Sequence, residues 1–390
     1  MLEELYTKLQ NNYSEMVSIR RYLHQHPELS FQETETANFI QKYYETLGIE
    51  VQGKIGGNGV VAKIYGAKPG RTIALRADFD ALPIQDEKDV PYKSKVPGVM
   101  HACGHDGHTA TLLVLAKSLH EMRAELEGTY VMIHQHAEEY TPGGAKPMIE
   151  AGCLDGVDAI FGTHLWATTP IGTIQSRVGP IMAAADRFEI TVKGKGGHGA
   201  QPQKTKDALV TAAQLVVNLQ QIVSRKVNPI DSAVVTIGSF VADNAFNVIA
   251  DKAKLIGTVR TFKEETRQMI ETEIERITKG TCLTNDCGYE YVFERGYPAL
   301  VNHKDETEFL IDCAQTVLGV EIVEAQTEPH MGGEDFAYYL EKVKGCFFFT
   351  GAGSSDAFPH HHPRFDIDER AMLIAAKTLA TVAINYQKSS

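Results

Sequence analysis

The stretch GVMHACGHDGHTA, residues 98–110, gathers side chains that bind transition metals. Zinc accepts imidazole and thiolate ligands together, and glycines permit tight backbone geometry that lets nearby side chains converge. A cysteine beside histidines can also act as a nucleophile, so a thiol hydrolase is the rival prediction. The candidate ligands of this stretch are His101, Cys103, His105 and His108.

Further candidate ligands follow other predicted strands. Open α/β sheets place their sites at the carboxyl ends of the strands, so these groups are expected to meet at one edge. Two cations about 3.5–4 Å apart can share such ligands and work as one hydrolytic centre. Each group alone is better explained as a structural or solvated residue, and only their joint occurrence predicts a metal site. The groups are Asp78, Asp80, Glu138, Glu139, His164 and the run His360–His362.

The elements that must position these residues indicate an α/β protein. Up to about residue 184, predicted strands alternate with helices, which is typical of a mostly parallel sheet covered on both faces. Residues 187–294 instead follow the order β-α-β-β-α-β of the split ferredoxin-like unit. From residue 297 the mixed α/β pattern returns.

We therefore predict two domains, in agreement with a chain of 390 residues at about 150 residues per domain. Residues 1–184 and 297–390 form a mixed, mostly parallel-sheet catalytic domain of the phosphorylase/hydrolase-like kind. A smaller ferredoxin-like α+β domain, residues 185–296, interrupts it.

The composition argues against several classes of protein. The net charge is −12, with 38 basic and 50 acidic residues, whereas a nucleic-acid binder needs a basic face. No stretch approaches the roughly 18 apolar residues of a membrane span. The start, MLEELYTKLQ, does not resemble a secretory signal, and six dispersed cysteines suggest reduced thiols. We expect a cytoplasmic protein that binds neither nucleic acid nor a membrane.

Motifs along the whole chain resemble those of the dinuclear-metal N-acyl-amino-acid amidohydrolases. This family includes aminoacylases, hippurate hydrolases and auxin-conjugate hydrolases, and is related to co-catalytic metallopeptidases. The resemblance implies a hydrolase of linear amides that releases free amino acid and carboxylate from N-acyl, foremost N-acetyl, L-amino acids. The motifs are HQHPELSFQE (24–33), LRADFDALPI (75–84), HACGHDGHTA (101–110), HAEE (136–139), GTHL (162–165), KGKGGHGAQP (193–202), NVIAD (247–251), GTVR (257–260), GGEDFA (332–337) and HHHPRFD (360–366).

The resemblance implies two divalent metal ions per subunit, Mn or Zn, with Ni or Co as further candidates. Asp78 stands where the wider superfamily has a histidine, so direct binding of a metal by Asp78 or Asp80 stays open. The implied ligands, with the cysteine as the bridge, are Cys103, His105, Glu139, His164 and His361.

Catalytic and substrate-binding roles are implied in the same way. Glu138 would accept the proton of a metal-bound water that attacks the amide and pass that proton to the leaving amine. His198, on a glycine-rich loop, would stabilise the oxyanion, in relatives from the opposing subunit. Asp80 would keep a supporting carboxylate role. Asn247 and Arg260 would bind the substrate, because guanidinium matches the geometry of a carboxylate.

The resemblance also implies that the inserted domain serves as a lid and forms a homodimer. Two alternatives to N-acyl-amino-acid hydrolysis stay open. One is a dipeptidase-type metallopeptidase. The other is a non-catalytic module that binds a metal or ligand, because architecture alone does not decide chemistry.

Overall fold

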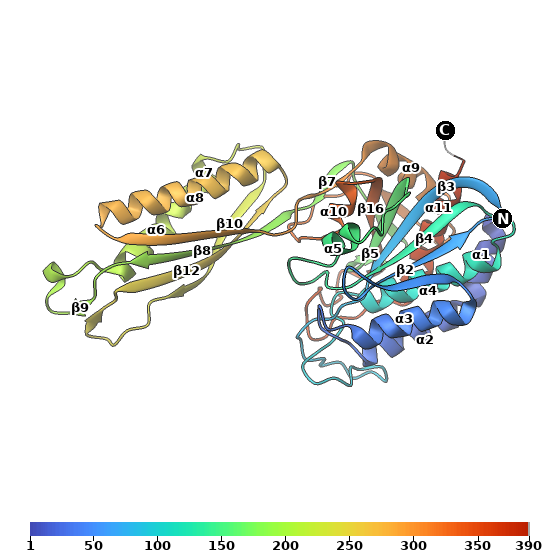
Figure 1. The fold of residues 1–390 in the computed structure, drawn as a ribbon, viewed down its shortest axis with the longest axis horizontal. Helices are drawn as coiled ribbons and strands as arrows, with labels where there is room; N and C mark the ends of the chain where they lie inside the picture. Colours follow the sequence, from blue (N-terminus) through green and yellow to red (C-terminus); the bar gives the residue numbers. More distant parts are fainter. Residues whose placement is uncertain (389–390) are drawn as a thin grey trace. The chain divides into compact units, whose positions relative to one another are not determined.

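The chain folds into two units in the computed structural model, which describes residues 1–388 (Figure 1). Unit 1 contains Met1–Ile181, Val301–Glu328 and the described residues from Asp335 onward. Unit 2 contains Met182–Leu300 and the short segment Pro329–Glu334. That segment joins unit 2 through a bridge between Met182 and His330, in which Ala183 N donates to His330 O at 3.0 Å. Contacts between residues that are far apart in the sequence therefore determine which unit a segment belongs to.

Unit 1 is built on an eight-stranded mixed sheet in the order β1-β2-β4-β3-β5-β16-β6-β15. The four central strands β4, β3, β5 and β16 run parallel to one another, which confirms the predicted mixed, mostly parallel sheet. The strands are Glu50–Ile55 (β1), Gly59–Tyr65 (β2), Lys68–Asp78 (β3), Glu127–Gln135 (β4), Ala159–Pro170 (β5), Thr173–Gln175 (β6), Ile322–Glu324 (β15) and Lys344–Gly353 (β16).

Helices cover both faces of this sheet, so its central strands are apolar on both sides (Figure 1). Helices α4 and α11 pack on one face together with α1, α2, α3 and α9, whereas α5 and α10 pack on the other. The helices are Leu2–Asn11 (α1), Tyr13–Gln25 (α2), Thr34–Leu47 (α3), His105–Glu121 (α4), Ala145–Glu150 (α5), Lys304–Ala314 (α9), Ala337–Leu340 (α10) and Arg370–Tyr386 (α11).

Helix α4 carries part of the candidate site into the core. Its residues are buried almost all round, as expected for a helix that packs against a sheet and other helices. It starts directly after Gly104, whose φ of 92° lies in the left-handed region that glycine adopts readily. The sharp turn there places Cys103 just before the helix and His105 at its first position.

Unit 2 has a four-stranded antiparallel sheet in the order β10-β12-β8-β13. Along the chain the main elements follow the order β8-α6-β10-β12-α8-β13, which confirms the predicted ferredoxin-like unit. A two-stranded sheet, β9 with β11, adds to it. The elements are Ala184–Lys193 (β8), Gly197–His198 (β9), Ala208–Leu219 (α6), Gln221–Arg225 (α7), Ala233–Val241 (β10), Val248–Ile249 (β11), Lys252–Thr261 (β12), Glu264–Thr284 (α8) and Gly288–Arg295 (β13).

The described residues contain no helix with both the length and the apolar composition needed to cross a membrane.

Candidate metal centre

The candidate ligands of unit 1 gather at the carboxyl ends of its parallel strands. Strand β3 ends at Asp78, β4 ends just before the pair Glu138–Glu139, and β5 contains His164. These strands are neighbours in the order β4-β3-β5, so their ends meet at one edge. The first turn of α4 adds His105 at the same edge.

Cys103 belongs to two groups of possible ligand atoms. Its Sγ lies 3.4 Å from His164 Nε2, and in the first group the ligand atoms of Cys103, His105 and His164 all lie within 4.8 Å of one another. In the second group, those of Cys103, Glu139 and His361 meet the same limit, with Glu139 Oε1 3.2 Å from His361 Nε2. A thiolate shared by two groups can bridge two cations.

The two buried histidines of the first group direct Nε2 at it and use Nδ1 elsewhere. His105 Nδ1 lies 3.0 Å from the carbonyl oxygen of Asp80, and His164 Nδ1 lies 3.0 Å from that of Leu165. A carbonyl oxygen only accepts, so in both rings Nδ1 carries a proton, and in the neutral form of each ring Nε2 has the lone pair that a metal needs. Metal-ligating histidines typically donate their other N–H in this way.

Buried atoms without partners provide a test of whether a cation fits here. Among the described residues, His105 Nε2 is buried and has no hydrogen-bond partner, and Glu139 Oε1 is buried with His361 Nε2 3.2 Å away. His105 Nε2 lies 3.9 Å from Glu138 Oε2 and 3.8 Å from Glu139 Oε1, so this nitrogen faces two carboxylates. Leaving a buried polar group unsatisfied costs about 1–3 kcal/mol, and a divalent cation between these acceptors would remove that cost. The residues therefore fit a metal.

The pKa shifts at the centre reflect the carboxylates that surround Cys103 and His105. Burial raises the pKa of the Cys103 thiol well above its usual value, and Glu139 raises it further. Burial lowers the pKa of His105, but Asp78 and Asp80 outweigh it and raise that pKa to about 10. A bound cation takes over the role of these protons, because metal binding favours the thiolate and the neutral imidazole.

His108 does not present a free nitrogen to the centre. Its Nδ1 lies 2.6 Å from Asp78 Oδ1, and Leu165 N donates to its Nε2 at 2.8 Å. Both ring nitrogens are therefore used, even though its ligand atoms lie near those of Asp78 and His105. His101 is also buried, with its ring 6.3 Å from that of His24. Of the candidates in residues 98–110, Cys103 and His105 are brought into the ligand groups around the shared thiol.

Asp78 and Asp80 accept hydrogen bonds from residues in and around the ligand groups. Arg76 donates to Asp78 Oδ2 at 2.6 Å. Burial raises the pKa of Asp78, but His105 and Arg76 outweigh it and hold the pKa well below its usual value. Asp80 Oδ2 accepts from Glu139 N at 3.0 Å. Asp80 therefore contacts both His105 and Glu139 and can orient them, whereas Asp78 is held by Arg76 and His108 with its Oδ2 3.8 Å from His105 Nε2.

A buried network that sequence reasoning missed supports this edge of the sheet. Arg76 donates to Gln135 Oε1 at 2.9 Å and to Asp335 Oδ1 at 3.0 Å. Gln135 Nε2 and Ala145 N also donate to the Asp335 carboxylate. Burial raises the pKa of Asp335 to about 6, against the opposing effect of Arg76. The motifs LRADFDALPI and GGEDFA contain Arg76 and Asp335, but their pairing across the chain could not be read from either.

Unit 2 brings two of its three candidate residues together. His198 in β9 is exposed and pairs with Val248 in β11, and Gly199 N donates to Asn247 O at 2.8 Å. His198 and Asn247 therefore lie side by side, beyond the end of β8 at Lys193. Arg260 pairs with Ala185 at the start of β8. Since a strand rises about 3.3 Å per residue, Arg260 lies at the opposite end of the sheet.

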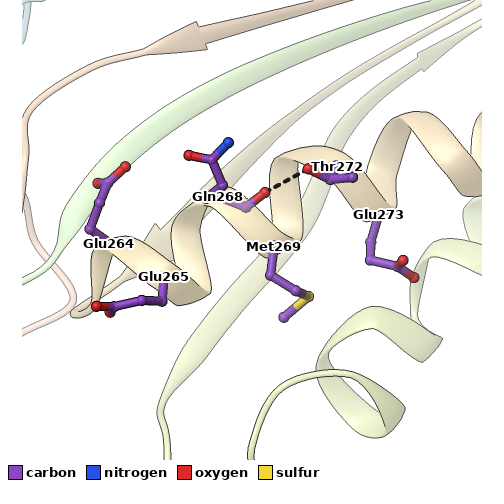
Figure 2. A pocket seen from close by; sticks show the side chains of 6 residues that line it. All are labelled: Glu264, Glu265, Gln268, Met269, Thr272 and Glu273. Carbon is purple, nitrogen blue, oxygen red and sulfur yellow. Dashed lines mark hydrogen bonds between the residues drawn. The ribbon is translucent and has the colours of Figure 1, made fainter.

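A groove of about 480 Å³ lies on the surface of unit 2 along α8 (Figure 2). It is not organised as a catalytic site, because its lining comes from one face of a single helix. Two of its carboxylates already have cationic partners: Glu264 pairs with Arg295, and Glu273 pairs with Arg276 at 2.7 Å. The lining residues are Glu264, Glu265, Gln268, Met269, Thr272 and Glu273.

Comparisons with known proteins agree with this geometry. Residues 74–385 match the family described as Peptidase family M20/M25/M40. The chain is 62% identical over 389 residues to YhaA of Bacillus subtilis (strain 168), named as an amidohydrolase, with 99% of this chain and 98% of that protein covered. It is 42% identical over 378 residues to N-acetylcysteine deacetylase of the same strain, covering 95% of this chain and 97% of the relative.

A solved structure shows the same fold. A Bacillus subtilis protein described as a dinuclear metal binding peptidase from the M20 family superposes with a TM-score of 0.84 at 39% sequence identity. The match covers 98% of this chain and 100% of the other.

Proposed function

Because the chain belongs to Peptidase family M20/M25/M40, we propose that it hydrolyses the amide bond of N-acyl, foremost N-acetyl, L-amino acids. The chain is a hydrolase acting on amide bonds, as its amidohydrolase and deacylase relatives are. The observation that carries the proposal is the position of Cys103 in two groups of ligand atoms beside Glu138.

The ligand groups support a pair of divalent ions. Cys103, His105 and His164 would hold one ion, and Cys103, Glu139 and His361 would hold the other. Bound ions of this kind supply Lewis acidity, which lowers the pKa of a water molecule and polarises a carbonyl oxygen. We propose Mn or Zn, with Ni or Co as further candidates, because thiolate and imidazole favour zinc whereas carboxylates tolerate manganese.

Glu138 is the proposed general base and acid. Its Oε2 lies 3.9 Å from His105 Nε2, and its carboxylate lies within 4.8 Å of the ligand atoms of His105 and Glu139, so it borders both groups that share Cys103. Glu138 accepts the proton of the attacking water and donates it to the leaving amine. Asp80 assists by holding His105 Nδ1 and Glu139 N, which orients both ligands.

The residues of unit 2 are proposed to act in a homodimer. His198 would stabilise the oxyanion, and Asn247 and Arg260 would bind the substrate carboxylate. His198 and Arg260 lie at opposite ends of the sheet of unit 2, so a small substrate cannot touch both residues of one copy. Asn247 lies beside His198, so we assign both His198 and Asn247 to the site of the partner subunit and Arg260 to the site of its own chain, with unit 2 as lid and dimerisation domain.

An exposed surface of unit 2 suits such an interface. Strand β10 is an edge strand of the four-stranded sheet, and edge strands readily pair with another chain. Helix α6 exposes apolar side chains that a second copy could cover. They are Leu209, Val210 and Val217.

The thiol-hydrolase alternative is disfavoured by electrostatics. A nucleophilic cysteine needs a lowered pKa, whereas burial and Glu139 raise the pKa of Cys103. The six cysteines are free thiols, which is typical of a reducing compartment, so we propose a cytoplasmic location.

The deciding experiment removes the metal with a chelator and restores Mn²⁺ or Zn²⁺ before a screen of N-acetyl amino acids, other N-acyl amino acids and dipeptides. We expect activity to disappear with the chelator, to return with metal and to be highest on N-acetyl amino acids. Activity that resists the chelator would instead support thiol chemistry. A preference for dipeptides would make the chain a dipeptidase, and metal binding without hydrolysis would make it a binding module.

A further inference from the structure

The pair Glu138–Glu139 follows a strained backbone. Ala137 has a φ of 51°, in the left-handed region, which costs a residue other than glycine about 1–3 kcal/mol unless its surroundings enforce it. The turn Ala137–Glu139, which we call the elbow, connects the end of β4 to the ligand group. Something must therefore hold Ala137 in this conformation.

Glu33 provides that restraint. Its Oε1 accepts a hydrogen bond from Ala137 N at 2.8 Å, and its Oε2 accepts from Asn58 Nδ2 at 3.1 Å. On the other side of the residue, Gly144 N donates to Ala137 O at 3.1 Å. Both backbone groups of Ala137 thus have fixed partners, and one of these is a side chain from a distant part of the sequence.

The burial of Glu33 is costly and calls for a reason. The side chain is fully buried, and burial together with Asp80 raises its pKa to about 7. A buried carboxyl group is expensive unless its hydrogen bonds compensate. The partners found for Glu33 are the amide of Ala137 and the side chain of Asn58, and Glu33 belongs to none of the groups of ligand atoms found among the described residues.

The segment around Glu33 also supports the far end of the elbow. Ser30 Oγ donates to Asp80 Oδ2 at 2.7 Å, and the same oxygen accepts from Glu139 N at 3.0 Å. The elbow is therefore held at both ends, at Ala137 N by Glu33 and at Glu139 N by Asp80. With its ends fixed, Glu139 points its Oε1 toward His361, 3.2 Å from Nε2.

We propose that Glu33 is a positioning residue whose carboxylate holds the left-handed Ala137, so that Glu139 reaches the group of Cys103 and His361 while Glu138 stays beside it as the base. The part that concerns Glu138 rests on the proposed function. The part that concerns Glu139 requires only that the group binds a metal.

The test is the metal occupancy of Glu33→Ala in the full-length protein, titrated with Co²⁺ and followed by absorption and by elemental analysis. We expect the wild type to bind two ions. In the variant, affinity at the Glu139-containing group should fall about tenfold to a hundredfold, as for other residues that orient ligands, while the group with His105 and His164 keeps its ion. The turnover rate should fall by a similar factor with little change in KM. Two tightly bound ions and wild-type turnover would overturn the proposal.

Two further variants separate positioning from general stability. Glu28 lies in the same segment, and its side chain accepts from Glu35 N and Thr36 N at the start of α3 without touching the elbow, so Glu28→Ala should bind both ions normally. Glu33→Gln keeps an oxygen that can accept from Ala137 N and should retain two ions. Selective loss of one ion in Glu33→Gln, or the same loss in Glu28→Ala, would contradict the hydrogen-bond account.

Two further outcomes also test the role of Glu33. If Glu33→Ala does not fold, Glu33→Asp replaces it, because the shorter side chain keeps the charge but withdraws the oxygen from Ala137 N. Selective loss of one ion then supports the proposal, and wild-type binding overturns it. If the wild type hydrolyses no N-acyl amino acid but Glu33→Ala still loses one ion selectively, the proposed function fails and the positioning role stands.

Discussion

The Sγ of Cys103 lies 3.4 Å from Nε2 of His164, although 61 residues separate them in the chain. His164 uses Nδ1 to contact the carbonyl oxygen of Leu165, so its lone pair is directed at the thiol. Burial, reinforced by His108, lowers the pKa of His164 well below its usual value and keeps the ring neutral. A neutral imidazole beside a thiol is the pair from which a divalent cation can displace a proton.

The first prediction is that Cys103→Ala binds fewer than two ions per chain at metal concentrations that saturate the wild type. Both ligand groups contain Cys103, so its removal weakens both. Elemental analysis after dialysis measures the occupancy. Cys153→Ala is the matched control, since Cys153 is a buried thiol of unit 1 outside these groups. Full occupancy in Cys103→Ala would contradict a shared thiolate.

The second prediction concerns the base. Glu138→Gln should retain both ions and lose about a hundredfold to ten-thousandfold in turnover rate, the usual contribution of a general acid–base group. Glu150→Gln, on the exposed end of α5, should behave as the wild type. Steady-state kinetics on an N-acetyl amino acid, together with metal analysis, provide the measurement. Unchanged turnover in Glu138→Gln would exclude the proposed mechanism.

The third prediction concerns stability. Arg20 is fully buried and donates to Asp106 Oδ2 at 2.9 Å and to Asp366 Oδ1 at 2.6 Å. Arg20→Met should lower the free energy of unfolding by about 3–5 kcal/mol, because it leaves buried charge uncompensated. Its neighbour Arg21 pairs with Glu369 but is about half exposed, so Arg21→Met should cost less than about 1 kcal/mol.

Urea denaturation of both arginine variants checks this prediction. An equal loss of unfolding free energy in Arg20→Met and Arg21→Met would show that the buried ion pairs of Arg20 stabilise the fold no more than the surface pair of Arg21.

The fourth prediction concerns pH. Burial lowers the pKa of His134 to about 3, while Tyr44 OH lies 2.7 Å from its Nε2. The unfolded state therefore takes up a proton on His134 as the pH falls below about 6.5, whereas the folded state takes it up only near pH 3. The stability that depends on a neutral His134 is therefore complete above pH 6.5 and is lost as the pH falls toward 3. Between pH 7 and pH 5, His134 should account for about 2 kcal/mol of lost stability.

The measurement compares unfolding free energies of metal-free wild type and His134→Gln at the two pH values. The variant should be less stable at pH 7 but should lose less on acidification. A loss of the same size in both proteins would show that His134 does not remain neutral in the fold.

The fifth prediction tests the exchange of His198 between subunits. Glu138→Gln and His198→Ala should each be nearly inactive alone. Mixed in equal amounts after dissociation, they should recover about a quarter of wild-type activity, since half the dimers are mixed and each has one complete site. Activity that stays at the level of the separate variants would place His198 in the site of its own chain.

Local patterns in the sequence predicted much of the fold. The apolar run at 72–77 is typical of a strand covered on both faces, and it forms the carboxyl-terminal half of β3. The order of elements in residues 187–294 indicated the ferredoxin-like unit, because strand and helix periodicity are properties of short segments. Strand β1 has no such local signal, since its residues are mostly exposed or half-buried.

The sequence by itself determined that a thiol, imidazoles and carboxylates follow several predicted strands, and these residue types predict a metal site. Residue types alone do not distinguish His105 from His108, which both lie beside glycines in one motif; the resemblance implied His105, and the tertiary structure shows the physical difference between the two rings. It directs Nε2 of His105 at the carboxylates and engages both nitrogens of His108. It also brought Glu33 to the amide of Ala137. Which atom of a side chain faces which partner depends on contacts between distant segments, and no local pattern encodes them.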